Sequence, residues 1–148
     1  MEYQPRKIND NDLENLLELY KHLHPDDTNT AEDSLKKSWK QITTNENFFR
    51  YFVVEHNNAI IASCCISIIP NVTRRGRPYA LIENVITHPE HRRKGFGTLV
   101  LNEAIQYAQE QHCYKIMLLS DFKREEAHAF YNSLGFDENN KKGFILTL

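Results

Sequence analysis

The chain has 148 residues, of which 41% are hydrophobic and 26% are charged, and its 18 basic and 20 acidic side chains give a net charge of −2. A chain of this length buries roughly 70% of its unfolded surface, so we expect a single domain over residues 1–148 that needs no disulfide or metal to fold. The charge balance argues against a general binder of nucleic acid or anionic lipid. No apolar run approaches the ~20 residues of a membrane span. Residues 1–6 also lack the apolar stretch of a signal peptide.

The first part of the chain is predicted to hold a short strand and two helices. Residues 3–8 favour the strand. A helix follows, in which apolar side chains recur at helical spacing: Leu13, Leu16, Leu17 and Tyr20. It should end near His24, because a residue that precedes proline avoids the helical region. The second helix starts at Thr30 or Asp33, and its apolar stripe is Leu35, Trp39 and Ile42.

Three strands are predicted next, over residues 49–55, 59–69 and 79–87. The first two are rich in β-branched and aromatic residues and are joined by the turn His56-Asn57-Asn58, so they should form a hairpin. Cys64 and Cys65 are neighbours in the second strand, so their side chains should point to opposite faces and should not pair. With an odd total of three cysteines, this indicates a reducing, cytoplasmic compartment.

The second half alternates helices and strands. A long helix over 97–111, a strand over 114–120, a helix over 125–134 closed by Gly135, and a final strand over 144–148 are predicted. Strand–helix–strand units imply parallel crossovers, whereas the preceding hairpin implies antiparallel pairing. The expected fold class is therefore α/β with a mixed sheet.

The sharpest chemical pattern is Arg-Arg-Lys-Gly-Phe-Gly-Thr at residues 92–98, between a strand and the long helix. It holds two of the five glycines in the chain and three consecutive cations. Glycines let backbone N–H groups converge on one point, and a helix N-terminus favours an anion there. The pattern predicts a phosphate or pyrophosphate site. The alternative is a helix start with a solvated basic turn.

Two common phosphate motifs do not fit this loop. A P-loop needs Lys followed by Ser or Thr after its glycine, whereas Gly97 is followed by Thr98 and Leu99. A dinucleotide fingerprint needs a third small residue, and Val100 stands in that place.

The Arg-x-x-Gly-x-Gly pattern of the loop resembles the GNAT superfamily of N-acetyltransferases. Ile-Glu-Asn-Val-Ile-Thr-His-Pro at 82–89 looks like the central strand of that family, and Ala-His-Ala-Phe-Tyr-Asn-Ser-Leu-Gly-Phe at 127–136 looks like its later helix and turn. Together the matches cover roughly residues 79–136. The resemblance implies a mostly antiparallel central sheet of six to seven strands flanked by about four helices, and acetyl-CoA as cosubstrate.

The resemblance also implies which residues hold the cosubstrate. The pantetheine arm would lie along the strand edge at Val85, Ile86 and Thr87, and the amide of Val85 or Ile86 would polarise the thioester carbonyl. The pyrophosphate would be held by the loop residues Arg92, Arg93, Lys94, Gly95, Phe96, Gly97 and Thr98.

Two residues are candidate catalytic groups. Glu83 is the only acid in its apolar strand, and a glutamate on this strand is the general base in relatives; the alternative is a surface or ion-paired side chain. Tyr131 occupies the position of the family's general acid, and the alternative is a packing tyrosine. No nucleophile is well placed to carry the acetyl group, so we expect direct attack by a primary amine in a ternary complex.

The acceptor is expected to be a small molecule such as an amino sugar or aminoalkylphosphonate, and a homodimer is expected because it is common in relatives. Arg74, Arg75 and Arg77 are either a solvated hairpin tip or a subsite for an anionic acceptor. Arg124 departs from the family, in which many members have asparagine.

Two further interpretations bear on the function. His22 and His24 have no additional ligands at zinc-type spacing, so no metal site is expected. The alternative function is a non-catalytic module that binds acyl-CoA as a sensor or scaffold, which would need the loop but not both Glu83 and Tyr131.

Overall fold

The computed structural model describes residues 2–27 and 32–148, so Thr30, one of the two expected helix starts, lies outside the described residues. The chain forms two compact units, Met1–Met117 and Leu118–Leu148, and each unit is described by itself.

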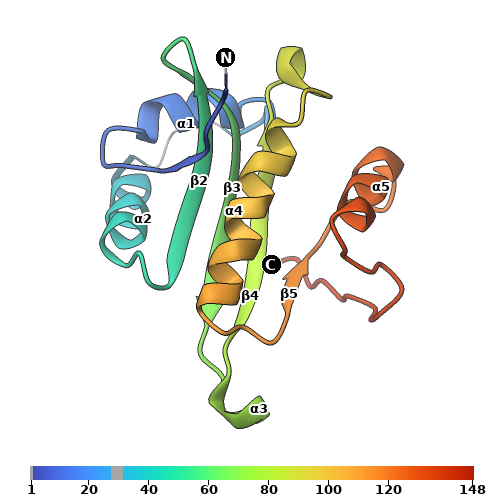
Figure 1. Cartoon of the computed structure of the whole chain (residues 1–148). Coiled ribbons are helices and arrows are strands. Elements are labelled where there is room, and N and C mark those ends of the chain that lie inside the picture. Colours follow the sequence, from blue (N-terminus) through green and yellow to red (C-terminus); the bar gives the residue numbers. More distant parts are fainter. Residues whose placement is uncertain (1, 28–31) are drawn as a thin grey trace. The chain divides into compact units, whose positions relative to one another are not determined.

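The elements follow the predicted order for most of the chain (Figure 1). In sequence they are β1 (Arg6–Lys7), α1 (Leu13–Tyr20), α2 (Glu32–Thr44), β2 (Phe49–His56), β3 (Ala59–Ile69), α3 (Thr73–Gly76), β4 (Tyr79–Thr87), the 3-10 turn η1 (Pro89–His91), α4 (Phe96–Glu110), β5 (Ile116–Leu118) and α5 (Glu125–Ser133). None of the helices in the described residues is long and apolar enough to span a membrane.

The expectation of six to seven strands was wrong, because the described residues form five strands and five α-helices. The missing strand is the one predicted at 144–148, whose residues belong to no helix or strand. Its apolar composition favours an extended backbone, but a strand also needs a hydrogen-bonded neighbour.

The strand order in the sheet is β1-β2-β3-β4-β5. The pairings from β1 to β4 are antiparallel. Between β4 and the chain leading into β5, the Tyr114 N–H donates to Pro78 O and the Ala80 N–H donates to Lys115 O, both at 3.0 Å. These partners advance along the chain in the same direction, which is the pattern of a parallel pair. The sheet is therefore mixed and mostly antiparallel, as predicted.

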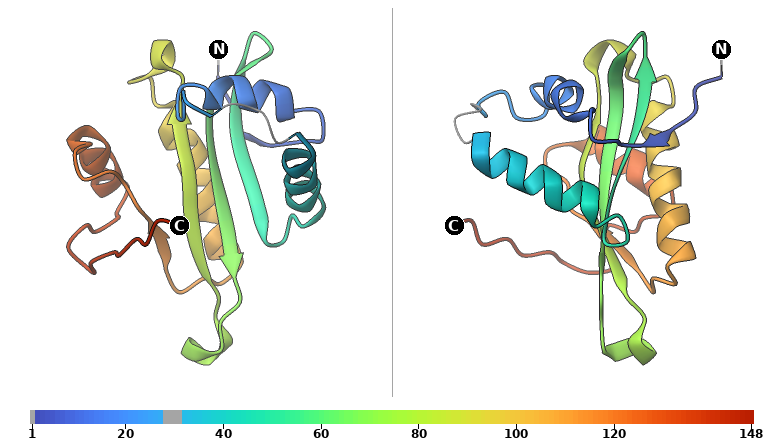
Figure 2. Two further views of the ribbon diagram at one scale, coloured as in Figure 1. Left: turned by 180° about the vertical axis from the view of Figure 1, so that it is seen from behind. Right: turned by 90° about the vertical axis from the view of Figure 1, so that its left-hand side faces the viewer.

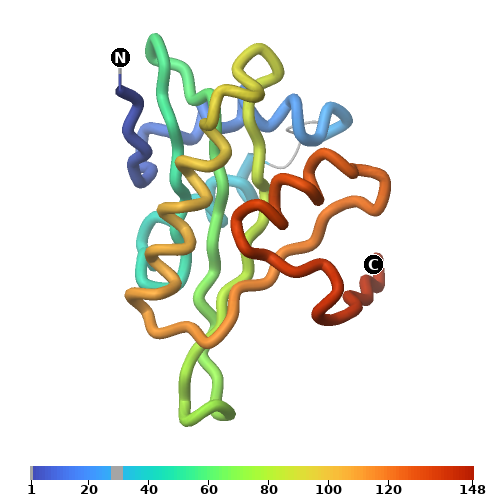
Figure 3. The backbone as a smooth tube through the Cα atoms, turned by 45° about the vertical axis from the view of Figure 1, so that its right-hand side comes forward, coloured from blue at the N-terminus to red at the C-terminus, as the bar shows by residue number. Residues whose placement is uncertain are grey.

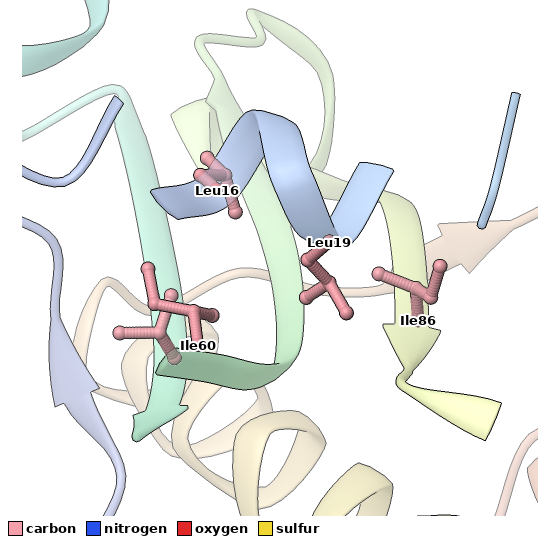
Figure 4. Packing of buried hydrophobic residues seen from close by; sticks show 5 residues of the cluster. Leu16, Leu19, Ile60 and Ile86 are labelled. Atoms are coloured by element: carbon pink, nitrogen blue, oxygen red, sulfur yellow. The ribbon is translucent and has the colours of Figure 1, made fainter. Parts of the chain in front are cut away.

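Helices cover both faces of the sheet in the first unit, with α1 and α2 on one face and α4 on the other (Figure 2). On the first face, Leu16 and Leu19 of α1 pack against Ile60 of β3 and Ile86 of β4 (Figure 4). On the second face, α4 buries an apolar side that includes Val100, Leu101 and Ala104. This packing fixes the end of β4 and the start of α4, between which the glycine loop lies.

The adjacent cysteines point to opposite faces of the sheet, as predicted. The Cys64 thiol donates to Val100 O of α4 at 3.3 Å. Cys65 is paired in register with Tyr51, which packs against the α1 face. Both thiols are free, and burial raises the pKa of Cys65 to about 11. Neither thiol is therefore a good source of thiolate at neutral pH.

An ion-pair network ties β1 to α1 and to the hairpin. Arg6 forms two hydrogen bonds to Asp12, Nη1 to Oδ2 at 2.7 Å and Nη2 to Oδ1 at 2.9 Å, and Nη2 also reaches Glu55 Oε2 at 2.6 Å. The Asn9 N–H donates to Asp12 Oδ2 at 2.7 Å. These donors lower the pKa of the buried Asp12 carboxyl.

Candidate acetyl-CoA site

β4 carries a bulge at the residues expected to contact the cosubstrate. Glu83 is opposite Cys65 and Ile86 is opposite Ser63, so Asn84 and Val85 together face a single residue of β3. Asn84 has φ 52°, a left-handed conformation that asparagine tolerates better than β-branched residues. A bulge leaves its extra residue outside the ladder and re-aims neighbouring side chains.

The Glu83 side chain is exposed. The desolvation argument made from the sequence therefore does not apply, because this carboxylate is not buried. The Cys65 thiol donates to the Glu83 backbone carbonyl at 3.2 Å, so this hydrogen bond does not involve the carboxylate. An exposed carboxylate can accept a proton from a solute amine without any opening of the fold.

The glycine loop presents unsatisfied backbone amides. Gly95 is the N-cap of α4 with φ 86° and no side-chain cap, and Arg93 also has positive φ, 59°. The Leu99 N–H donates to Gly95 O at 3.1 Å. The amides of Phe96, Gly97 and Thr98 precede it in the first turn, where a helix offers them no acceptor. Left-handed residues next to a helix N-terminus form the concave arrangement of N–H groups that binds anions.

The space in front of the loop is open. A Cβ built on Gly95 would meet no atom within 4 Å. The side chains of Arg92, Arg93 and Lys94 are exposed around it, and no salt bridge among the described residues involves them. Positive charge and free amides therefore border the same open region.

The loop is anchored to the end of β4. Arg92 Nε donates to Thr87 O at 3.3 Å, and Lys94 Nζ donates to Glu90 O at 3.1 Å. The structure thus brings together the predicted strand-edge and loop residues. Phe96 differs from the others because its ring is buried edge-on against Tyr3, with centroids 4.8 Å apart, so only its amide is available to a ligand.

Ile86 also contributes through its backbone, because its side chain belongs to the core under α1. Val85 and Thr87 are half-buried.

Tyr131 lies in α5 of the second unit and is buried. Its ring is tilted against Phe130, with centroids 5.4 Å apart, and edge-on to Phe136 at 6.1 Å. Gly135 closes the helix with φ 95°, as predicted. Arg124 is the N-cap residue of α5 and makes no side-chain cap.

A histidine cluster beside the loop was not foreseen as a unit. His22 stacks edge-on against His88 with centroids 4.5 Å apart, and His91 lies 5.6 Å from both His88 and His56. These residues come from three separate segments, because only His88 and His91 are close in the sequence, so no local pattern indicates the whole cluster. Burial and the nearby charge of Lys94 lower the pKa of His91. No group in the described part of the chain has an arrangement suited to a metal ion.

The basic hairpin tip lies at the other end of β4 from the glycine loop (Figure 3). Arg77 Nε donates to His112 O and Nη2 to Cys113 O, both at 3.1 Å, so this side chain braces the turn after α4. Glu83 follows Arg77 by six positions along an extended chain, a distance of roughly 20 Å. This placement favours a structural role for Arg77 over an anion subsite beside Glu83.

Comparison with known proteins shows which family this chain resembles. The model of the family described as "Acetyltransferase (GNAT) family" matches residues 13–136. The glucosamine 6-phosphate N-acetyltransferase of Trypanosoma brucei brucei is 29% identical over 63% of this chain and 61% of the relative. An uncharacterized N-acetyltransferase of Methanocaldococcus jannaschii is 30% identical over 97% of this chain and 65% of the relative. The chain thus spans less than two thirds of the length of these curated relatives.

The solved structure of a putative acetyltransferase from Agrobacterium tumefaciens has 37% identity and a TM-score of 0.89, and the match covers 98% of this chain and 99% of that one. The region matched by the family model, residues 13–136, contains β4, the glycine loop and α5. The chain therefore belongs to the GNAT family of acetyltransferases.

Proposed function

We propose that this chain transfers an acetyl group from acetyl-CoA to the primary amine of a small molecule. The glycine loop carries the proposal: free amides, exposed cations and open space meet at the N-terminus of α4, and β4 ends beside it. This arrangement suits a pyrophosphate group, which the cosubstrate supplies together with a reactive thioester.

The cosubstrate would be held by backbone more than by side chains. The amides of residues 93–98 would bind the pyrophosphate, and Arg92, Arg93 and Lys94 would add counter-charge. Val85, Ile86 and Thr87 would offer main-chain groups to the pantetheine arm. The bulge supports the choice of the Val85 amide as donor to the thioester carbonyl oxygen, because it displaces this part of β4 from regular pairing.

Glu83 and Tyr131 would carry out the two proton transfers of the reaction. Glu83 accepts the proton that the attacking amine loses, and Tyr131 donates a proton to the sulfur as the carbon–sulfur bond breaks and the carbon–nitrogen bond forms. The role of Tyr131 rests on the family resemblance of its segment. Direct transfer is supported by the cysteines, because burial raises the pKa of Cys64, Cys65 and Cys113 and makes each a poor nucleophile.

The acceptor class is proposed from relatives. A glucosamine 6-phosphate N-acetyltransferase is among the similar proteins, which supports an amino sugar phosphate or an aminoalkylphosphonate as the acceptor. Comparing each phosphorylated amine with its dephosphorylated form would measure the contribution of the anion.

The test is release of free thiol from acetyl-CoA across a panel of amino sugars, aminoalkylphosphonates, polyamines, amino acids and peptides, each against a blank without amine. One amine class should release thiol above the blank. Glu83→Gln should lower kcat on the order of 10²-fold. The matched control is Glu14→Gln, an exposed glutamate of α1, which should leave kcat unchanged. Bound acetyl-CoA with no release in any sample would instead support the sensor alternative.

A further inference from the structure

The bulge in β4 is contacted by a cysteine side chain of β3. The Cys65 thiol donates to the backbone carbonyl of Glu83 at 3.2 Å, and Asn84 Nδ2 donates to Cys65 Sγ at 3.8 Å. One sulfur atom therefore contacts two consecutive residues of β4, the last residue before the bulge and the first residue within it. A thiol is a weak donor and a weak acceptor, but together the two contacts tie this short segment to the opposite strand.

The backbone of the bulge needs such contacts because its conformation is unfavourable. Asn84 has φ 52°, a region that residues with a side chain rarely adopt, and the extra residue interrupts the ladder of backbone hydrogen bonds. A conformation of this kind persists only where its surroundings hold it. The Cys65 sulfur does so from both sides, since it gives the Glu83 carbonyl a donor and accepts from the side-chain amide of Asn84.

The Cys65 side chain is itself held in place. It is buried, and Tyr51 lies opposite it in β2 and is a further hydrogen-bonding partner of its thiol. The Tyr51 ring is in turn edge-on to Trp39 of α2, with centroids 6.5 Å apart. Because burial raises the pKa of Cys65 to about 11, the thiol keeps its proton at neutral pH and remains a donor.

The bulge also decides which way the rest of β4 faces. Side chains alternate between the two faces of a strand, so one extra residue reverses the alternation beyond it. Ile86 is opposite Ser63 and packs in the core under α1, whereas regular pairing after Glu83 would turn it to the α4 face. Burial of Ile86 therefore preserves the bulge as such, and the contacts of Cys65 set its local geometry.

We propose that Cys65 is a positioning residue for acetyl transfer, whose thiol holds the bulge in the geometry that directs the Val85 amide to the thioester carbonyl. This inference rests on the proposed function, because the direction of the Val85 amide matters only if the chain binds a thioester. Cys65 acts through the backbone of β4 and does not touch the substrate. A donor must lie within hydrogen-bond distance of the oxygen that develops charge, so a loosened bulge lowers the rate more than it weakens binding.

The first test measures the backbone conformation of Asn84 by NMR in the protein without ligand. The Cα chemical shift of Asn84 and the coupling between its amide and α protons both report φ. In Cys65→Ala both should move toward extended values. The matched control is Cys64→Ala, which removes the neighbouring buried thiol, a donor to Val100 O on the other face of the sheet, and should leave both values as in the wild type. Wild-type values for Asn84 in Cys65→Ala would overturn the proposal.

The second test separates positioning from stability. Cys65→Ala should lower kcat roughly 10-fold, less than the roughly 10²–10³-fold that loss of an oxyanion donor costs. Its Kd for CoA should equal that of the wild type in isothermal titration calorimetry, because the glycine loop is untouched. Cys65→Ser keeps a donor and should recover most of kcat, and Cys64→Ala should keep kcat while losing unfolding free energy. A kcat in Cys65→Ala equal to that of Cys64→Ala would contradict a positioning role.

A further variant covers the case in which Cys65→Ala does not fold. Asn84→Gly accepts a positive φ and removes the side-chain contact with the sulfur, so it should also lower kcat with CoA affinity retained. A wild-type kcat in Asn84→Gly would argue against the proposal. A wild type that transfers no acetyl group to any amine would refute the proposed function and the role of Cys65 with it, whereas unchanged Asn84 values in Cys65→Ala would refute the role of Cys65 alone.

Discussion

Replacement of Gly95 by alanine tests whether the glycine loop binds the cosubstrate through its backbone. Gly95 has φ 86°, and an alanine Cβ would meet no atom within 4 Å. Its cost to folding is therefore conformational only, about 1 kcal/mol for an alanine held in the left-handed region. This cost should appear in the free energy of unfolding measured with urea.

The effect on CoA binding should be larger than the effect on stability. The new methyl group would occupy the open space where the pyrophosphate must approach the amides. Loss of one or two charge-assisted hydrogen bonds, about 1.5–3 kcal/mol each, weakens binding by roughly 10-fold to more than 100-fold. Isothermal titration calorimetry with CoA measures this change directly.

Two matched controls carry the same backbone strain elsewhere. Gly76 has φ 75° and Gly135 has φ 95°, and a Cβ at either meets nothing within 4 Å. Gly76→Ala and Gly135→Ala should each lose about 1 kcal/mol of unfolding free energy and keep wild-type affinity for CoA. The reasoning is refuted if Gly95→Ala binds CoA as the wild type does, or if all three variants lose affinity equally.

Three other outcomes are expected. Asp12→Asn should lose about 1–3 kcal/mol of unfolding free energy at pH 7, because it breaks the paired charge on Arg6. Since Arg6 lowers the pKa of Asp12, this contribution is present above the unfolded pKa of about 4 and is lost as pH falls through the folded value. The difference between wild type and variant in urea denaturation should therefore shrink as the pH is lowered below about 4. His91→Asn should reduce the loss of unfolding free energy at acid pH. The pKa of His91 is lowered in the folded state, so the wild type loses stability as pH falls below about 6.5. An equal loss of unfolding free energy in the variant between pH 7 and 5 would contradict this. Tyr131→Phe should lower kcat on the order of 10²-fold with acetyl-CoA affinity retained, and an unchanged kcat at every pH would remove Tyr131 from the mechanism.

Features set by local chemistry were predictable from the sequence. The turn of the β2–β3 hairpin is one example, because Asn57 and Asn58 adopt left-handed conformations, φ 50° and 62°, that asparagine accepts. The closure of α5 at Gly135 is another. The glycine loop was also predicted, since its glycines, cations and helix start are consecutive in the chain.

Features set by pairing between distant segments were not predictable. The bulge at Asn84 depends on the register between β3 and β4. Glu83 lies beside this bulge, and its side chain is exposed rather than buried. The strand predicted at 144–148 has the right composition, but composition does not specify a partner. The contact between His22 and His88 joins two segments more than sixty residues apart, which no periodicity encodes.

Transfer of isotope-labelled acetyl from acetyl-CoA to an amine, followed by mass spectrometry of both products, tests the central claim most directly. The account predicts that one amine class acquires the label in amounts equal to the free CoA released, and that the protein itself acquires none. Acetyl-CoA that binds while every amine in the panel remains unlabelled would contradict an acetyltransferase, and label retained on the protein would contradict direct attack.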